Sequence, residues 1–422
     1  MKLNVRTENP KFSPEYFNQL PTILLLFISL RITILLFFTP EGPLNVYTDY
    51  YYYFRISQLS EDGYFPFINM WSIYPPISTY YVHSAYMLSK LFLPGKIIDP
   101  VGYQLYTRVL GALLLIFEAG VLILVHHIAM KVWNNKYANW IAWAYAGLSL
   151  PLFFWYFSHN VIMVFFFLLA VDRFIHLKRG QSSIALGVGI SAKIIPITLF
   201  APVTKFMWHK KKELILYFLI AGLTIILIYT PFILADGLPW IKASFTSLIR
   251  KGSYSTIWAL IDGNWGGGDP GPWENRTQLD LANIPHATPT IIPEFIKIAI
   301  FGIIYLWIFR KPVDRNNPKH FIWFTTITLM IFYLWSKGWS PSWSTLVIPL
   351  LLLSLPNGRG LTLALLLTCL TFLEWPIANA LNSWPLFSFS IICRTLLFIA
   401  IITLVWFELW KGPKKNSLFQ KK

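Results

Sequence analysis

A single carboxylate lies among tyrosines shortly after the first long apolar segment. Asp49 is followed directly by Tyr50 to Tyr53, and further along the chain Tyr74 precedes two prolines. A carboxylate near the boundary of lipid and water is costly to leave unpaired, and beside a substrate hydroxyl it can act as a general base. The alternative is a solvated aspartate in an ordinary interfacial belt of tyrosines. We predict Asp49 as the catalytic base and Tyr50 and Tyr74 as further site candidates. The more ordinary role of Tyr74-Pro75-Pro76 is a turn into a following helix, which would anchor the far end of the loop that carries Asp49.

Four basic residues could hold a phosphate group. Lys337 lies in the segment 336–343, whose hydroxyls and backbone amides could donate to the same phosphate. The alternative there is a tight turn with a lysine that reaches to water. Lys193 interrupts an apolar stretch, where an ionisable side chain indicates a functional site or a buried ion pair. Arg250 and Lys251 are adjacent, so that they could bind a phosphate or form a plain surface charge pair.

Three further polar side chains complete the candidate set. Asp262 lies in a run from Ser255 to Asn264 that predicts a short helix followed by a glycine-containing loop. His286 follows and could act as an acid, a base or a phosphate donor, although a lone loop histidine usually does none of these. Ser336 precedes Lys337 and could donate to the same phosphate.

Other chemistries lack their sequence motifs. The chain contains no Walker loop, Rossmann fingerprint, zinc-ligand spacing or nucleophile elbow. We therefore predict no metal and no cofactor, and the absence argues against an ATP-driven pump and a nucleotide-sugar enzyme with a cytosolic catalytic domain. Both cysteines, Cys369 and Cys393, fall in apolar segments. The acids Glu118 and Asp172 are predicted to pair inside the protein with cations such as Arg108.

The composition is that of a membrane protein. Of 422 residues, 55% are hydrophobic and 13% are charged, whereas soluble domains average about 25% charged residues. Several segments reach the roughly 20 apolar residues that a membrane helix needs. We predict an all-α polytopic membrane protein in which residues 1–422 form one unit with about ten transmembrane helices. The predicted spans are 21–39, 103–130, 138–157, 160–176, 214–234, 291–310, 320–335, 343–356, 361–375 and 388–410.

Charge predicts how these helices are oriented. The net charge is +16, and most basic residues lie in loops on one side of the predicted spans, which is the cytoplasmic side in membrane proteins. The stretch 182–204 is broken by Lys193 and Pro196 and has basic clusters on both sides, so we predict a re-entrant hairpin. Both termini are then cytoplasmic. The membrane would be the plasma membrane, or that of the endoplasmic reticulum in a eukaryotic host.

This orientation leaves two long outer loops, at about 40–102 and about 235–290. We expect short surface helices in both, one of them at 76–92. Long outer loops on a helical bundle are where a binding or catalytic site is expected. Asp49, Asp262 and Lys337 would all lie on this side.

The order of these features resembles the GT-C glycosyltransferases, especially the mannosyltransferases that depend on polyprenyl-phosphate-mannose. The resemblance covers most of the chain and rests on the early aspartate followed by Tyr74-Pro75-Pro76, on Lys193 to Pro196, on Ser255 to Asn264 and on Ser336 to Pro341. It implies transfer of a hexose, preferably mannose, from a polyprenyl-phosphate donor to a lipid- or glycan-linked acceptor at the outer face. It also implies inversion at the sugar, Asp49 as the base, membrane lipids as surroundings and no nucleic acid as partner.

Two departures from that family bear on the mechanism. Many members have two acids together in the first outer loop, whereas Thr48-Asp49-Tyr50 has one, so we expect a base that works without a metal. Ser342-Trp343 stands where Gln-Tyr or a similar pair is common. A transporter or flippase of lipid-linked or small polar solutes is the alternative. Such a protein should have a pair of broken helices in its two halves, whereas this sequence has one broken segment, at 182–204, and no second one to match it. A non-catalytic membrane partner would tolerate loss of Asp49.

Overall fold

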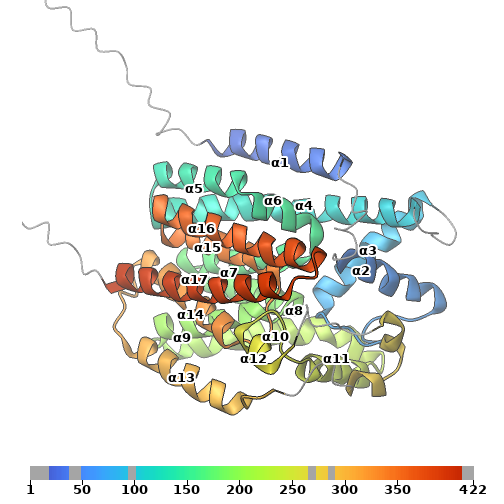
Figure 1. Ribbon diagram of the computed structural model, residues 1–422. Helices are drawn as coiled ribbons and strands as arrows, with labels where there is room; N and C mark the ends of the chain where they lie inside the picture. The colour runs from blue at the N-terminus through green and yellow to red at the C-terminus, as the bar shows by residue number, and fades with distance from the viewer. Residues whose placement is uncertain (1–18, 38–48, 94–100, 265–271, 284–289, 411–422) are drawn as a thin grey trace, which may run out of the picture.

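Most helices of the computed structural model run side by side along one direction (Figure 1). The structure describes residues 19–37, 49–93, 101–264, 272–283 and 290–410, and His286 lies outside them. The N-terminal half contains α1 (Leu20–Phe37), α2 (Asp49–Gln58), α3 (Pro76–Phe92), α4 (Val101–Val132), α5 (Asn135–Gly147), α6 (Ser149–Phe157), α7 (Asn160–Ile175) and α8 (Arg179–Ala192). The C-terminal half contains η4 (Ile195–Leu199), α9 (Phe200–Met207), α10 (Lys211–Leu234), α11 (Leu238–Arg250), α12 (Ile257–Asp262), η5 (Trp273–Thr277), η6 (Asp280–Asn283), α13 (Glu294–Arg310), α14 (Pro318–Trp335), η7 (Pro341–Trp343), α15 (Ser344–Ser354), α16 (Gly358–Phe372), η8 (Leu373–Ala378) and α17 (Trp384–Trp410).

The expected all-α architecture is confirmed for the described residues, which form no β-strand beyond two isolated bridges. Five helical stretches are long and apolar enough to cross a membrane: α1, α4, α10, the joined α16 and η8, and α17. The count of about ten spans stays a prediction, because the other described helices are shorter or less apolar than these five.

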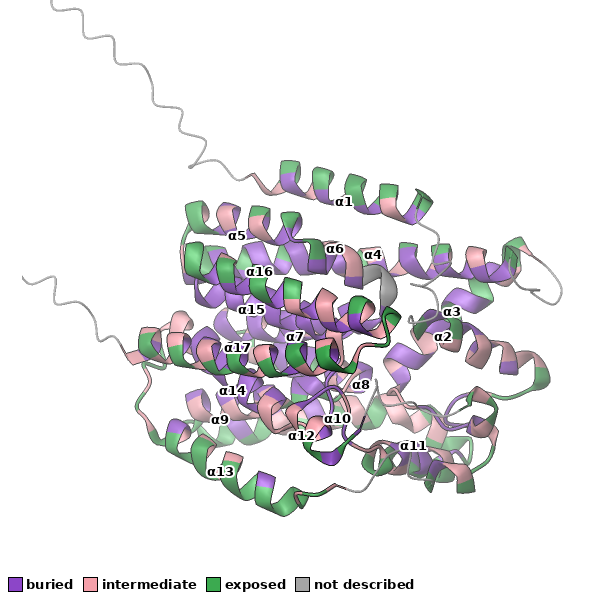
Figure 2. Cartoon of the chain, in the orientation of Figure 1, coloured by how far each residue is buried: buried purple, intermediate pink, exposed green. Residues whose placement is uncertain are grey.

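The distribution of buried residues also fits a membrane bundle. All residues of α15 are buried, whereas α10 buries only Leu214, Tyr217 and Ala221 and exposes a row of leucines and isoleucines. Figure 2 shows the same contrast between the largely buried α7 and α15 and the exposed outer faces of α1 and α13. Helices in lipid associate by close contact of small residues. At Gly187 of α8, an added Cβ would lie 2.8 Å from the carbonyl oxygen of Ala221 in α10.

Buried ion pairs join helices that are far apart in sequence. Arg31 of α1 and Glu118 of α4 lie 2.8 Å apart, both buried, and the hydroxyl of Tyr145 contacts the same carboxylate. Asp172 is likewise paired, with neighbours in α4 and at the end of α7 that are described below. The predicted pairing of these acids inside the bundle is confirmed, but Arg31 takes the place expected for Arg108, since a sequence does not show which cation faces Glu118.

Two local signals were predicted correctly. The helix at 76–92 is α3, which begins with Pro75 as its N-cap and Pro76 as its first residue. It is not a lone surface helix, however, because its buried face packs against α4 and α8, and the Ser78 hydroxyl donates to the Ala192 carbonyl over 2.8 Å. The predicted break at Lys193 is present, with an extended backbone between α8 and η4.

One predicted span differs from the structure. Residues 138–157 do not form a continuous helix, because Leu148 has an extended backbone that separates α5 from α6. In the second outer loop the expected short helices are α11, α12, η5 and η6. Of these, α11 lies with α2 and α3 at one end of the bundle, on the right of Figure 1.

Candidate active site

Asp49 is the first residue of α2, and two tyrosine hydroxyls converge on it. Tyr53, one turn further along α2, donates to Asp49 Oδ2 over 2.8 Å, and Tyr74 donates to the same oxygen over 3.3 Å. A carboxylate at a helix N-terminus is also stabilised by the helix dipole. The Asp49 side chain itself is exposed. The carboxylate is thus held by two donors and accessible from outside.

The turn before α3 holds Tyr74 in place. The backbone N–H of Tyr74 donates to Ser72 Oγ over 3.3 Å, and the Thr79 hydroxyl donates to the Tyr74 carbonyl over 2.8 Å. Pro75 and Pro76 fix the backbone at the helix start. The tyrosine is therefore oriented by its own turn.

Burial and the charge of Asp49 raise the pKa of both tyrosines well above the usual range. Tyr53 and Tyr74 therefore stay protonated at any physiological pH. Each remains a donor to the carboxylate and does not compete with it as a base.

His159 lies behind the two tyrosines and was missed in the sequence. Its ring is 4.3 Å from that of Tyr74 and 5.0 Å from that of Tyr53, both edge-on. The side chain is buried, and neither ring nitrogen has a hydrogen-bond partner in the described part of the chain. Burial and the nearby charge of Lys193 lower its pKa well below the usual range, so the imidazole is neutral. The available signal was the polar triplet from Ser158 to Asn160 between two predicted spans.

Lys193 also lies close to Tyr74. Its ammonium donates to Asn160 Oδ1 over 2.5 Å and lies 5.5 Å from the ring centre of Tyr74 and 5.1 Å from that of Trp343. Such positions favour a cation. Asn160 in turn donates to Ser342 Oγ over 2.5 Å. The break in the predicted hairpin therefore meets the segment 336–343 and the loop of Asp49.

Lys251 reaches the same region through Tyr254. Its ammonium lies 4.2 Å from the centre of the Tyr254 ring. Burial, with the charge of Asp49, raises the pKa of Tyr254 above its usual value. Arg250 ends α11 and is exposed. Tyr50, by contrast, is fully buried with its ring 6.3 Å from Tyr53, so it belongs to the core beneath the site.

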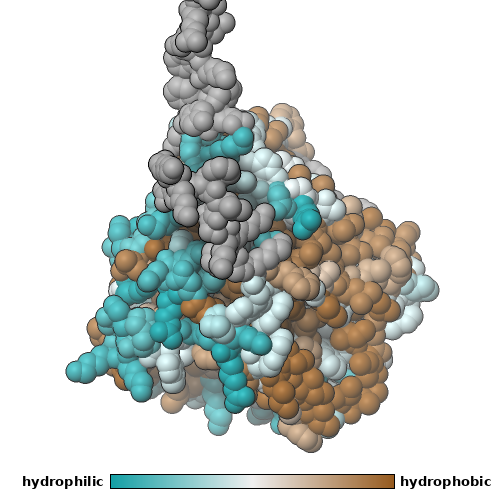
Figure 3. All heavy atoms as spheres, turned by 90° about the vertical axis from the view of Figure 1, so that its left-hand side faces the viewer, coloured by the Kyte–Doolittle hydropathy of each residue, from teal (hydrophilic) through white to brown (hydrophobic). Residues whose placement is uncertain are grey.

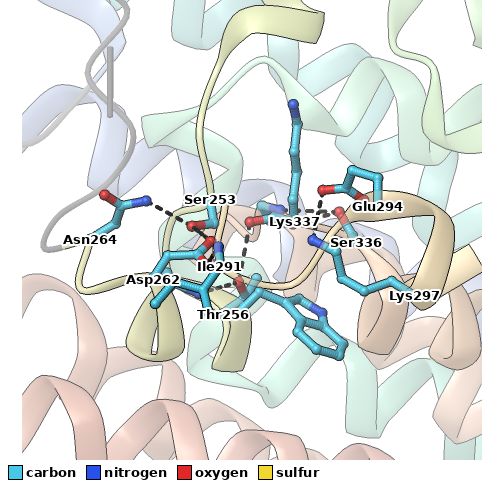
Figure 4. Close-up of polar contacts among 12 residues, drawn as sticks. Ser253, Thr256, Asp262, Asn264, Ile291, Glu294, Lys297, Ser336 and Lys337 are labelled. Atoms are coloured by element: carbon cyan, nitrogen blue, oxygen red, sulfur yellow. Dashed lines mark hydrogen bonds and ion pairs between the residues drawn. The ribbon is translucent and has the colours of Figure 1, made fainter. Parts of the chain in front are cut away.

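The segment 336–343 is tied to the second outer loop by backbone contacts. The N–H of Tyr254 donates to the Lys337 carbonyl over 3.0 Å, and the N–H of Trp339 donates to the Tyr254 carbonyl over 3.1 Å. Thr256 Oγ1 also donates to the Lys337 carbonyl, over 3.1 Å. Figure 4 shows the contact of Thr256 with Lys337 together with those of Asp262. Tyr254 is thereby held next to the aspartate loop.

Lys337, Ser336 and Asp262 make structural contacts. The Lys337 ammonium donates to the Ile249 carbonyl in the last turn of α11 over 2.8 Å, pointing away from the Asp262 contacts in Figure 4. Ser336 Oγ donates to the carbonyl of Gly338. Asp262 accepts from Ser253 Oγ over 2.6 Å and from the N–H of Ile291 over 2.8 Å.

Among the described residues, one group of three side chains lies close enough together to hold a metal ion. His127, Asp172 and His176 place one ligand atom each within 4.8 Å of the others. His127 Nδ1 lies 2.6 Å and His176 Nδ1 lies 3.3 Å from Asp172 Oδ1. His127 is near the far end of α4, whose start contacts α2 through Tyr51 and Tyr103. At about 1.5 Å per residue the cluster is tens of ångströms from Asp49.

Comparisons with known proteins give little more. No protein-family model and no curated protein matches the chain. Among solved structures it is similar to the Archaeoglobus fulgidus oligosaccharyltransferase in the apo form, with 13% identity and a TM-score of 0.43 over 92% of this chain and 55% of that one. The same protein in complex with Zn and sulfate is similar with 12% identity and a TM-score of 0.37, over 89% of this chain and 53% of that one. The chain spans about half the length of these structures. A likeness of this size does not define a function.

Proposed function

We propose that the protein is a membrane glycosyltransferase of the GT-C type. It would move a hexose, preferably mannose, from a polyprenyl-phosphate donor to a lipid- or glycan-linked acceptor on the outer face. The observation that supports this is that an accessible carboxylate and a lysine ammonium both lie close to one tyrosine. Asp49 accepts from the Tyr74 hydroxyl, and Lys193 lies 5.5 Å from the centre of the Tyr74 ring.

In the proposed reaction an acceptor hydroxyl attacks the anomeric carbon of the donor sugar. Asp49 takes the proton of that hydroxyl, the new glycosidic bond forms, and the bond between the sugar and the phosphate oxygen breaks with inversion. The electron pair leaves on the phosphate, which needs cations and no strong acid. A positioned general base contributes roughly 10²–10⁴-fold, and fixed charge near a leaving group usually accelerates such a reaction more than any other single effect.

Lys193 and Lys251 are the proposed ligands of the leaving phosphate. Lys193 is fixed by Asn160 and two aromatic rings, and Lys251 stands over Tyr254 at the edge of the same region. Arg250 and Lys337 remain proposed phosphate ligands on the adjoining loop. Lys337 would first have to release the Ile249 carbonyl.

The test is sugar transfer by membranes that contain the full-length protein. Radiolabelled polyprenyl-phosphate-mannose and polyprenyl-phosphate-glucose are the donors, and nucleotide sugars are the control. We expect Asp49→Asn to keep expression and to reduce transfer by roughly 10²–10⁴-fold, the contribution of a general base. Asp280→Asn is the matched control, because Asp280 is an exposed aspartate in the second outer loop. Near wild-type turnover by Asp49→Asn would remove Asp49 as the base. Movement of the labelled lipid without transfer would identify a flippase.

A further inference from the structure

A large cavity with a basic rim lies at the end of the bundle opposite Asp49. It has a volume of about 590 Å³, within the range of ordinary ligand pockets. It is bordered by the end of α4, the turn between α7 and α8, the turn between α9 and α10, and the link between α13 and α14. Its basic side chains are Lys131, Arg179, Lys210 and Arg315. These come from four separate parts of the chain.

The floor of this cavity is aromatic and closely packed. Phe174 and Phe321 stack with ring centres 4.2 Å apart, and Phe206 meets Phe321 edge-on at 5.2 Å. Arg179 is fixed on this floor, 3.7 Å from the centre of the Phe174 ring, and its Nη1 donates to the Phe174 carbonyl over 2.6 Å. The cavity thus joins an apolar base to a cationic rim, which suits an amphiphile with an anionic head.

The charges around the rim do not cancel. Glu213 is the acid in the lining, and it is engaged by Lys210 at 3.0 Å. Asp314 is exposed beside Arg315 in the same link. Lys131 and Arg315 are both exposed and have no ion pair within the described residues. Two cations are therefore available to a ligand, in addition to the fixed Arg179.

The surroundings indicate that lipid headgroups lie at this level. Three lysines lie over tryptophan rings around this end: Lys211 over Trp208, Lys311 over Trp307 and Lys319 over Trp133, at 6.0, 4.9 and 3.9 Å. Tryptophan and lysine gather where a bilayer meets water. Figure 3 looks at this end and shows hydrophilic residues beside a broad hydrophobic flank. Trp208 directly precedes His209 of the cavity and is 56% exposed.

We propose that this cavity binds the phosphate headgroup of an anionic membrane lipid. The phosphate would contact Lys131, Arg179 and Arg315, and the apolar part would lie against the aromatic floor and the exposed flank of α10. Basic pockets between membrane helices are known to suit such headgroups. The site is separate from that of Asp49, and the inference does not depend on the proposed transfer reaction.

Lipid binding to the purified full-length protein tests this site. The probes are dioleoyl phosphatidylglycerol, dioleoyl phosphatidylcholine and inorganic phosphate, with bound lipid counted by native mass spectrometry and the unfolding midpoint measured in parallel. We expect retention and thermal stabilisation with phosphatidylglycerol only. Lys131→Ala and Arg315→Ala should each weaken phosphatidylglycerol binding about five-fold, the effect of one basic residue near an anionic surface.

The matched control is Arg359→Ala. Arg359 is an exposed arginine at the start of α16 that does not line the cavity. Equal weakening by Arg359→Ala, or equal binding of phosphatidylcholine, would overturn the proposal. If inorganic phosphate raised the unfolding midpoint as much as phosphatidylglycerol does, the cavity would be a site for a soluble phosphate and not for a lipid. A variant that has merely lost its fold is recognised by a lower midpoint without added lipid.

Discussion

At the scale of the residue, the site is built around Tyr74. Its hydroxyl contacts Asp49, and its ring faces both Lys193 and the neutral His159. Both donors to the carboxylate use Oδ2, and Oδ1 accepts no hydrogen bond from the residues that the structure describes. This leaves one oxygen for the proton of an acceptor hydroxyl. The tyrosines orient the base, and Asp49 itself is the group that would react.

Tyr74→Phe tests whether the hydroxyl of Tyr74 positions the carboxylate of Asp49 for the reaction. The change keeps the ring against Lys193 and His159 but removes one donor to Asp49. Because a hydrogen bond to a charged group is worth about 1.5–3 kcal/mol, we expect kcat to fall roughly ten-fold or more. Kinetics with the polyprenyl-phosphate donor measure this. Tyr64→Phe, at an exposed tyrosine of the same region, should have no effect, and an equal loss in both variants would contradict the role of Tyr74.

Lys193→Met should act mainly on the chemical step. The negative charge of the phosphate grows as the sugar bond breaks, so a fixed cation stabilises the transition state more than the bound donor. We expect kcat to fall roughly 10²–10³-fold with a smaller change in the donor KM. Lys193→Arg should restore part of the rate. A rise in KM at constant kcat would show that Lys193 binds the donor without assisting its cleavage.

At the scale of the element, the turn between α14 and α15 connects the site to the second outer loop. The backbone pairs Tyr254 with Gly338, and a Cβ at Gly338 would lie 2.2 Å from the Tyr254 ring. Burial and the charge of Asp49 raise the pKa of Tyr254. Lys337, on the same turn, holds the end of α11. The contacts of this turn therefore hold the segment around Tyr254 and the end of α11 in place.

Gly338→Ala should loosen this link. The added methyl group overlaps the Tyr254 ring, and overpacking of this kind costs about 1–3 kcal/mol. We expect a lower unfolding midpoint and faster proteolysis within residues 235–290. Gly302→Ala is the control, because a Cβ there meets nothing within 4 Å. Unchanged proteolysis of the loop in Gly338→Ala would show that the bridge does not hold it.

The helix starts and breaks were predictable because their causes are local. Pro76 begins α3, Gly263 ends α12 in the left-handed region, and Lys193 interrupts the chain between α8 and η4. The break at Leu148 was missed, although Gly147 ends α5 directly before it and Pro151 lies in the first turn of α6.

At the scale of the whole molecule, the two ends of the bundle differ in chemistry. One end combines Asp49, Tyr74 and Lys193, and the other combines a basic cavity with lysine and tryptophan pairs. The predicted orientation would place the Asp49 end outside. The whole chain, 1–422, would then act as one membrane unit with its site between its outer loops.

Labelling of introduced cysteines tests this orientation in intact cells or sealed vesicles. In a background with Cys369→Ser and Cys393→Ser, we expect Asp280→Cys to react with a membrane-impermeant maleimide from outside. Arg359→Cys should react only after permeabilisation, because the excess of basic residues keeps its loop in the cytoplasm. Both positions are exposed. If Arg359→Cys reacted from outside and Asp280→Cys only after permeabilisation, the predicted topology would be wrong and the protein would be oriented the other way.

The sequence alone predicts a membrane protein, a helical fold and several helix ends, because apolar length and caps act through neighbouring residues. It also singled out Asp49 and Lys193 as unusual in their surroundings, and Tyr74 as part of a turn into a helix. Only the tertiary structure decided that these three residues meet, that His159 lies among them, and that Lys337 holds α11. Such contacts join residues distant in the chain, and they follow from how the helices pack rather than from any local pattern.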